Sequence, residues 1–331
     1  MNLGDLGELA LVERLGRYLA EEGGPLLLGP GHDAAVILPL EGNLVFKVDA
    51  LVEGRHFDLA FSTPQQVGWR ALARPASDIA AVSGTPDYAL ITLFAPATCP
   101  LEVVEGLYEG LAEAAKAFGT KLVGGETTSA EELALSVAIL GIVEPGESKG
   151  RSGARAGDRI SISGFLGDAA AGLAILKAGG VTGLADKYDL SAEESAALAT
   201  CVEHYQTPHP RLALGKALGA KPEITAMMDV SDGLAIDLHR LARASGLAAR
   251  VQLEALPLSP GALLAARLLG LDPLALALGG GDDYELLVCS TKDLLACDIL
   301  KKMLPIGLLE ETEVKCMKVL RETGGLMTID A

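Results

Sequence analysis

A short stretch in the second half of the chain carries an unusual density of polar groups. Residues 229–234 read DVSDGL, which places Asp229, Ser231 and Asp232 between an apolar run and a helical pattern. Two carboxylates and a hydroxyl suit a bound divalent cation, because hard cations take oxygen ligands. They suit an ordinary helix start equally well, since Ser-Asp-Gly is a common signal at helix N-termini. The stretch alone therefore leaves the question of a cation open.

The rest of the chain repeats this use of acids. Single acids follow apolar runs or stand in turns of small residues at Asp33, Asp49, Asp78 and Glu126. Any one of them has a simpler explanation, because an Asp in a glycine-rich turn commonly caps its own backbone. Repetition in one kind of context favours a shared role. Together with Asp229 and Asp232, we expect these acids to converge on magnesium ions, and through the ions on phosphates.

The hydrophobic pattern predicts the elements that position these acids. Helical spacing predicts helices over 5–21 and 65–83, the second interrupted near Pro75. Strands are expected before Asp49, Glu126 and Asp229, over 44–48, 121–123 and 223–228 respectively. Strands and helices alternate in both halves, which predicts an α/β or α+β fold.

The length of 331 residues predicts two domains, because single cores rarely grow that large. The glycine-rich, charged segment 144–157 is the best candidate for their boundary. We therefore expect an N-terminal domain over residues 1–145 and a C-terminal α/β domain over residues 146–331.

Composition narrows the class of partner. The formal net charge of −17 argues against a nucleic acid or an anionic membrane. Aromatic residues make up 4%, too few for stacking platforms along single-stranded nucleic acid. The five cysteines form no C-x-x-C pair, which favours free thiols in a reducing cytoplasm. The first residues lack a signal-peptide pattern, and no apolar run is long enough to predict a membrane span.

Weaker candidates for phosphate contact accompany the acids. Gly124 and Gly125 stand at a predicted strand end, where glycine lets backbone amides approach phosphate closely. No Gly-Lys-Ser or Gly-Lys-Thr of a Walker A loop occurs, so turn formation explains the glycines as well. Arg151 suits a phosphate clamp or a solvated linker. His56, beside Phe57, is more simply a structural histidine.

Taken together, these pieces resemble the thiamine-monophosphate kinase family. That family belongs to an ATP-binding superfamily with aminoimidazole ribonucleotide synthetase and selenophosphate synthetase. The similar segments run in order along nearly the whole chain: 7–9, 31–35, 48–57, 68–69, 77–81, 124–127, 150–158, 210–211, 229–234 and 280–286. Each segment is weak by itself, and the ordered set is specific.

The resemblance implies a two-domain fold like that of aminoimidazole ribonucleotide synthetase, with N-terminal strands forming a barrel across a homodimer. It implies transfer of the γ-phosphoryl group of ATP to thiamine monophosphate, with several Mg²⁺ ions and ATP as co-substrate. The implied magnesium ligands are Asp33, Asp49, Asp78, Glu126, Asp229 and Asp232. The implied ATP contacts are Gly125, Arg151 and Ser231, and the implied substrate contacts are His56 and Asp282.

The chain departs from the usual pattern of that family at several positions. Lys47 stands where a threonine is usual, Glu126 replaces an Asp, and Asp282 replaces a Glu. A lysine there either neutralises phosphate or displaces a cation. Two alternatives stay open: another ATP-using enzyme of the superfamily, and a non-catalytic paralogue that binds thiamine phosphates or ATP. Selenophosphate synthetase is disfavoured, because it needs a reactive cysteine near the N-terminus and the first cysteine here is Cys99.

Overall fold

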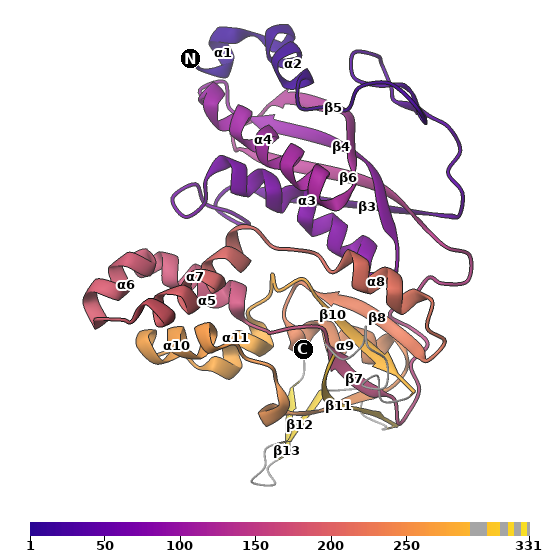
Figure 1. Ribbon diagram of the computed structural model, residues 1–331, viewed down its shortest axis with the longest axis vertical. Coiled ribbons are helices and arrows are strands. Elements are labelled where there is room, and N and C mark those ends of the chain that lie inside the picture. Colours follow the sequence, from indigo (N-terminus) through magenta and orange to yellow (C-terminus); the bar gives the residue numbers. More distant parts are fainter. Residues whose placement is uncertain (292–302, 312–316, 321–325, 330–331) are drawn as a thin grey trace. The chain divides into compact units, whose positions relative to one another are not determined.

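The computed structural model describes residues 1–291, 303–311, 317–320 and 326–329, and its chain divides into two compact units (Figure 1). Unit 1 consists of residues 1–79 and 84–146, and unit 2 of residues 80–83 and 147–331. Each unit has hydrophobic clusters of its own.

Unit 1 is built on a mixed four-stranded sheet. The strand order is β3-β6-β4-β5, with β3, β6 and β4 antiparallel and β5 parallel to β4. Because β4 and β5 are parallel, their connection must cross the sheet, and α4 makes this crossover. The strands are β3 (Asn43–Val52), β4 (Thr85–Ala95), β5 (Lys121–Ser129) and β6 (Ala134–Val143).

Two long helices, α3 (Pro64–Ala81) and α4 (Leu101–Phe118), cover one face of this sheet (Figure 1). The alternation of β4 and β6 buries Ile91, Val137 and Ile139 against them. The helices approach each other closely at Gly68, where a Cβ atom would lie 1.9 Å from the carbonyl oxygen of Leu107. The prediction that Pro75 interrupts the helix is wrong, because α3 continues through this residue.

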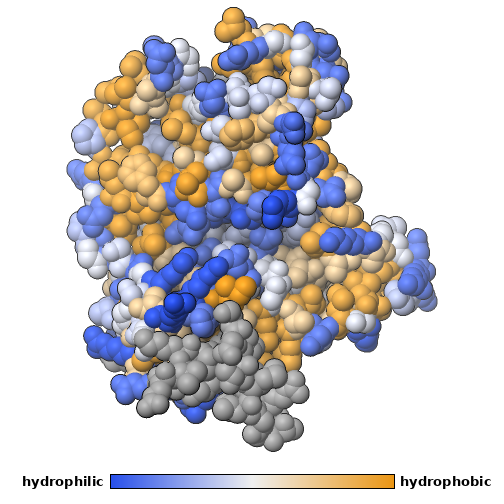
Figure 2. Space-filling model, turned by 180° about the vertical axis from the view of Figure 1, so that it is seen from behind, coloured by the Kyte–Doolittle hydropathy of each residue, from blue (hydrophilic) through white to orange (hydrophobic). Residues whose placement is uncertain are grey.

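The opposite face of the sheet is largely uncovered. A hairpin of β1 (Leu26–Leu28) and β2 (Val36–Ile37) contributes to a small cluster around Tyr88 on this side. Beyond it, apolar side chains face outward, with exposed fractions of 73% for Phe46 and 46% for Leu90. Leu44 and Val48 of β3 are exposed as well. In Figure 2, apolar residues gather on the surface of unit 1, in the upper half of the view.

The N-terminal segment differs from the prediction of one helix over 5–21. Two short helices form instead, α1 (Leu3–Leu6) and α2 (Glu8–Gly16). Gly7 separates them with a φ of 80°, a left-handed backbone conformation that favours glycine. The buried side chains of α2 are Leu11 and Leu15, whereas Leu9 is 87% exposed.

Unit 2 contains a seven-stranded sheet in the order β13-β12-β9-β11-β7-β10-β8. Its strands are β7 (Arg159–Ile162), β8 (Ile224–Val230), β9 (Ala248–Gln252), β10 (Glu285–Ser290), β11 (Leu304–Glu310), β12 (Met317–Leu320) and β13 (Leu326–Ile329). Among the described strand pairs of this sheet, β9–β12 is parallel and the others are antiparallel. The core strand β10 is buried along its whole length and β8 at every position except Thr225, as the apolar runs in the sequence lead one to expect.

The helices of unit 2 fall into two groups. The helix α9 (Leu234–Ala244) packs on the sheet through Leu234, Leu238 and Leu241. Two more helices share hydrophobic clusters with the strands, α8 (Leu212–Gly219) through Leu218 and α11 (Pro273–Gly279) through Ala277. The others lie beside the sheet (Figure 1): α5 (Asp168–Lys177), α6 (Gly180–Tyr188), α7 (Ala192–Gln206) and α10 (Pro260–Leu269). A one-turn 3₁₀ helix, η1 (Leu253–Ala255), follows β9. Within the described residues, no helix is both long and apolar enough to cross a membrane.

Candidate active site

Lys47 joins two of the predicted magnesium ligands. It lies on β3 two positions before Asp49, so both side chains point to the face of the sheet that carries α3. The Lys47 Nζ atom lies 2.9 Å from Oδ2 of Asp78, on α3, and 3.6 Å from Oδ2 of Asp49. Arg74, one turn earlier on α3, places Nη2 3.8 Å from Oδ1 of Asp49. Two acids and two bases thus form one partly exposed group.

The other two acids predicted from this half of the chain lie on other segments, Asp33 in a turn and Glu126 on β5. Asp33 is exposed in the turn before β2. Glu126 is exposed on β5, and its carboxylate accepts the backbone N–H of Thr127. Gly125, predicted to contact ATP, pairs with Ile91 of β4, where a Cβ atom would lie 1.8 Å from the Ile91 carbonyl oxygen. Only glycine fits that close approach of the two strands.

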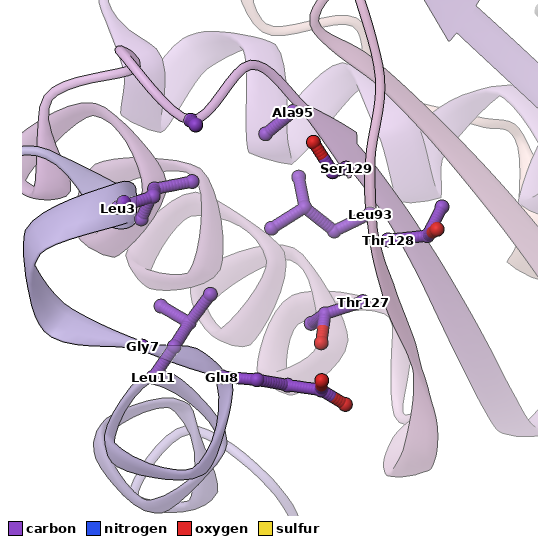
Figure 3. Close-up of a pocket in the computed structure, with 11 residues that line it drawn as sticks. Leu3, Gly7, Glu8, Leu11, Leu93, Ala95, Thr127, Thr128 and Ser129 are labelled. Atoms are coloured by element: carbon purple, nitrogen blue, oxygen red, sulfur yellow. The ribbon is translucent and has the colours of Figure 1, made fainter.

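A pocket of about 240 Å³ opens beside the same strands. Its walls come from α1, α2, β4 and β5, and its polar groups include Glu8, Thr127, Thr128 and Ser129. Figure 3 shows Glu8 extending from α2 toward Thr127, while Leu93 and Leu11 line the apolar side. Ligand pockets are typically roughly 300–1,000 Å³, so this one has room for a single ring system rather than a whole nucleotide.

His56, predicted as a substrate contact, has a structural role within its own loop. Its Nδ1 atom accepts the backbone N–H of Val52 at 3.1 Å, and the backbone N–H of His56 donates to the Val52 carbonyl at 2.9 Å. An accepting Nδ1 places the proton of a neutral imidazole on Nε2.

In unit 2, the stretch 229–234 turns tightly at the end of β8. Asp229 is buried, whereas Asp232 is exposed. The buried carboxylate of Asp237, one turn into α9, accepts the backbone N–H groups of both Ser231 and Asp232 at 2.9 Å. Burial raises the pKa of Asp237, and these two N–H groups work against that rise. Arg240 binds the carboxylates of Asp232 and Asp237, the second at 3.0 Å.

The segment 281–285 packs against that turn. The N–H of Asp282 donates to the carbonyl of Ser231 at 2.8 Å, and Asp282 and Tyr284 both have positive φ angles, of 57° and 51°. The Tyr284 hydroxyl donates to the Asp282 carboxylate. Such conformations are costly for residues other than glycine and tend to persist where a site needs them. The structure thus brings the backbone of Asp282 next to Ser231.

Two further acids, the partly buried Asp283 and the buried Glu285, follow Asp282 in the chain. Burial raises the pKa of Asp283 well above its usual value, and the N–H of Gly167 on its carboxylate opposes the rise. Glu285 is 3% exposed and accepts two donors from Arg211 as well as the hydroxyl of Ser163. Such a pair of parallel bonds fixes the arginine in orientation as well as in position.

Comparisons with known proteins match both units. Residues 31–143 match the family described as AIR synthase related protein, N-terminal domain, and residues 155–307 match its C-terminal domain. Thiamine-monophosphate kinase from Mycobacterium tuberculosis is 36% identical over 288 residues, 87% of this chain and 81% of its own. The enzyme of the same name from Aquifex aeolicus is 33% identical, over 95% of this chain and 94% of its own. The chain belongs to the thiamine-monophosphate kinase family.

Solved structures agree with this family assignment. The crystal structure of thiamine-monophosphate kinase from Stenotrophomonas maltophilia K279a matches with a TM-score of 0.78 and 33% identity, over 96% of this chain and 97% of that one. AaThiL complexed with AMPPCP and TMP matches with a TM-score of 0.73 and 31% identity, over 97% and 95%. Hydrogenase maturation protein HypE in complex with ATP, at 19% identity and a TM-score of 0.75, shares the fold.

The magnesium ions expected for a thiamine-monophosphate kinase can be tested against the donors present. Asp33, Glu126 and Asp232 are exposed carboxylates of the kind Mg²⁺ prefers. Asp49 and Asp78 fit a divalent ion poorly, because Lys47 and Arg74 already balance their charge. Among the described residues, no three His, Cys, Asp or Glu side chains form a ready metal cage.

Several residues of the candidate site were not predicted from the sequence. Asp237 and Arg240 recur at helical spacing behind Asp232, a signal of i, i+3 pairing that identifies them as partners in hindsight. Arg74 lies four positions before Asp78 on the same helix face. Arg211 and Glu285 are 74 residues apart, and no pattern in a single sequence pairs them.

Proposed function

We propose that this chain phosphorylates thiamine monophosphate with ATP, giving thiamine diphosphate and ADP. The observation that carries the proposal is the match to thiamine-monophosphate kinases through both units, at 33–36% identity over most of the chain. The match includes the acids and glycines that the sequence singled out.

The reaction asks little covalent chemistry of the protein. An oxygen of the thiamine phosphate attacks the γ-phosphorus of ATP, and the bond from that phosphorus to the bridging β-oxygen breaks. The nucleophile is already an anion, so no strong general base is needed. Two unit charges 4 Å apart repel by roughly 4 kcal/mol at an effective dielectric constant of 20. Catalysis therefore depends on placing cations between the two phosphates and holding them in line.

Magnesium supplies part of that positive charge when it is bound. The proposed ligands are Asp33 and Glu126 in unit 1 and Asp229 and Asp232 in unit 2. The resemblance implies the same role for Asp49 and Asp78, but we do not propose them as magnesium ligands, because Lys47 and Arg74 already neutralise their charge. Arg151 and Ser231 are proposed to contact ATP phosphates, and His56 and Asp282 to lie near the thiamine phosphate.

The pocket beside β5 is proposed to take the base of ATP. Its size suits one ring system, and Leu93 and Leu11 offer the apolar walls that a flat ring needs. The Glu8 carboxylate would accept a hydrogen bond from the amino group of the base. Gly125, proposed to contact ATP, lies on the same strand as the pocket residue Thr127. Replacing Leu93 with Trp should fill the pocket and raise the KM for ATP without changing the KM for thiamine monophosphate.

A homodimer is proposed as the working form. The uncovered face of the unit 1 sheet, with Phe46, Val48 and Leu90 exposed, supports pairing of two copies into a barrel. In this proposal residues 1–145 bind ATP and metal and form the dimer, and residues 146–331 form the C-terminal α/β domain. The free thiols of Cys99, Cys201 and Cys289 support a reducing compartment such as the cytoplasm.

The deciding experiment incubates the pure chain with ATP, Mg²⁺ and thiamine monophosphate and measures thiamine diphosphate by chromatography. Unphosphorylated thiamine is the matched control, because it lacks the attacking phosphate. Formation of thiamine diphosphate from the monophosphate alone is the expected result. No product at saturating substrates would contradict the proposal.

The same assay separates the alternatives. Phosphorylation of another acceptor in a panel would favour a different ATP-using enzyme of the superfamily. Calorimetric binding of thiamine monophosphate and ATP with no turnover would favour a non-catalytic binding protein. The neutralised pair of Asp49 and Asp78 is the observation that keeps the second alternative in view.

A further inference from the structure

Lys47 places its ammonium group within reach of two carboxylates, those of Asp49 and Asp78. Its ammonium lies 2.9 Å from Asp78 and 3.6 Å from Asp49, distances at which it interacts directly with both. The three side chains are 34%, 26% and 23% exposed, so solvent screens the group only in part. Strand β3 and helix α3 fix the geometry from opposite sides of the contact.

The local charge leaves little attraction for a second cation. Asp49 and Asp78 contribute two negative charges, and Lys47 and Arg74 contribute two positive ones. Mg²⁺ placed between the two acids would have to lie against the ammonium and would be repelled by it. The turn at 229–237 differs, because within the described part of the chain Arg240 is the one base that pairs with Asp232 and Asp237. A net negative charge remains on these three groups.

We propose that the Lys47 ammonium replaces one magnesium ion at the Asp49–Asp78 pair and presents a fixed positive charge to a phosphate. The presence of a phosphate rests on the proposed kinase function, whereas the exclusion of an ion rests on the contacts of Lys47 and Arg74 with the two acids. The chain accordingly holds one divalent ion fewer than it would with a neutral residue at this position. In this proposal the Lys47 ammonium is a cation that belongs to the protein, and the carboxylates of Asp49 and Asp78 hold it in position.

The same contacts could serve stability alone. A salt bridge from β3 to α3 ties the sheet to its covering helix, whatever binds nearby. The two accounts differ in the number of ions bound, because only the proposal predicts that removing the ammonium creates a new divalent site.

The test counts bound Mn²⁺ per chain, by the paramagnetic resonance of free Mn²⁺, with a non-hydrolysable ATP analogue present. The variant is Lys47→Thr, which removes the cation, opens space and keeps a residue that favours strands. Lys121→Thr, at the exposed start of β5, is the matched control. We expect one more Mn²⁺ per chain in Lys47→Thr than in the wild type or the control. Equal counts in all three would overturn the proposal.

A second variant keeps the test decisive if Lys47→Thr does not fold. In Asp78→Asn, made in the wild-type background, the proposal expects an unchanged Mn²⁺ count. Loss of one Mn²⁺ would mean that Asp78 holds an ion and would overturn the proposal. Turnover of the wild-type chain is measured separately, so that the two proposals can fail independently. If the wild type forms thiamine diphosphate but Lys47→Thr binds no extra Mn²⁺, the proposed kinase function stands and the proposal for Lys47 is overturned. If Lys47→Thr binds one extra Mn²⁺ but the wild type forms no thiamine diphosphate, the proposal for Lys47 stands and the kinase function is overturned.

Discussion

Asp78 is the residue whose role separates catalysis from stability most cleanly. Its carboxylate is partly exposed and contacts Lys47 from the C-terminal part of α3. A pair of this kind contributes about 0–1 kcal/mol to stability. A misplaced cation beside a reacting phosphate, in contrast, costs about 100-fold in rate.

We therefore expect Asp78→Asn to lower kcat by about 100-fold and to lower the unfolding temperature by no more than about 2–4 °C. The measurements are steady-state kinetics of thiamine diphosphate formation and a thermal unfolding curve on the same preparation. Asp186→Asn, at an exposed position of α6, is the control and should change neither. Parallel losses of activity and stability in Asp78→Asn would give Asp78 a structural role only.

At the scale of the secondary-structure elements, Gly125 fixes how closely β5 can approach β4. A Cβ atom there would lie 1.8 Å from the carbonyl oxygen of Ile91, so the strands must separate to admit one. We expect Gly125→Ala to destabilise the fold by about 1–3 kcal/mol, as overpacking of a tight contact does. Gly183→Ala is the matched control, because a Cβ atom on α6 meets nothing within 4 Å and alanine favours a helix. The midpoint of urea unfolding should fall in the first variant alone.

The ion pair of His204 and Asp168 links α7 to the start of α5, with 3.0 Å between Nδ1 and Oδ2. The Asp168 carboxylate raises the pKa of His204 above its usual 6.5, burial opposes the rise, and Glu285 and Arg211 act in opposite directions from farther away. A raised folded-state pKa stabilises the protein fully below the unfolded-state pKa of 6.5. That stabilisation is lost as the pH rises through the folded-state pKa.

His204→Gln keeps a donor and removes the charge, so it isolates this effect. The wild type should be more stable than the variant by about 0.5–1 kcal/mol at about pH 5.5, a modest value because the imidazole is partly exposed to solvent. The difference should shrink toward about pH 9. Urea unfolding at both pH values checks this, and a difference that stays constant with pH would show that the charge plays no part.

The elements with strong periodicity were predictable, and those determined by distant contacts were not. The strand before Asp49 and the apolar face of α9 follow from spacing alone, since Leu234, Leu238 and Leu241 repeat at helical intervals and are buried. The break at Gly7 was missed, because Leu9 continues the apolar pattern in sequence while lying exposed in the structure. Helix α6, over 180–188, was also missed, since it begins at a glycine.

The candidate site divides in the same way. The two-residue spacing of Lys47 and Asp49 puts them on one face of a strand, which the sequence states directly. That Asp78 meets the same ammonium depends on how α3 packs across the sheet, and no local pattern encodes that packing. The positive φ of Asp282 was likewise beyond prediction, because Ser231, which accepts the backbone N–H of Asp282, lies 51 residues earlier in the chain.

At the scale of the whole molecule, the uncovered face of the unit 1 sheet exposes apolar side chains to solvent. Residues on β3 and β4 that alternate with the buried core are apolar and point outward, among them Leu44, Phe46, Val48 and Leu90. Alternation of apolar residues on both faces of a sheet is typical of strands covered on both sides. One cover is α3 with α4, and a second copy of the same sheet is the proposed other cover.

This proposal predicts the effect of a single charge at the centre of that face. Leu90→Asp should turn a dimer into a monomer, because a carboxylate buried between two apolar sheets has no partner for its charge. Leu263→Asp is a close match, since Leu263 on α10 is 47% exposed and Leu90 is 46% exposed. Sedimentation equilibrium should give twice the chain mass for the wild type and for Leu263→Asp, and the chain mass for Leu90→Asp. A Leu90→Asp variant that sediments as a dimer would place the interface on another surface.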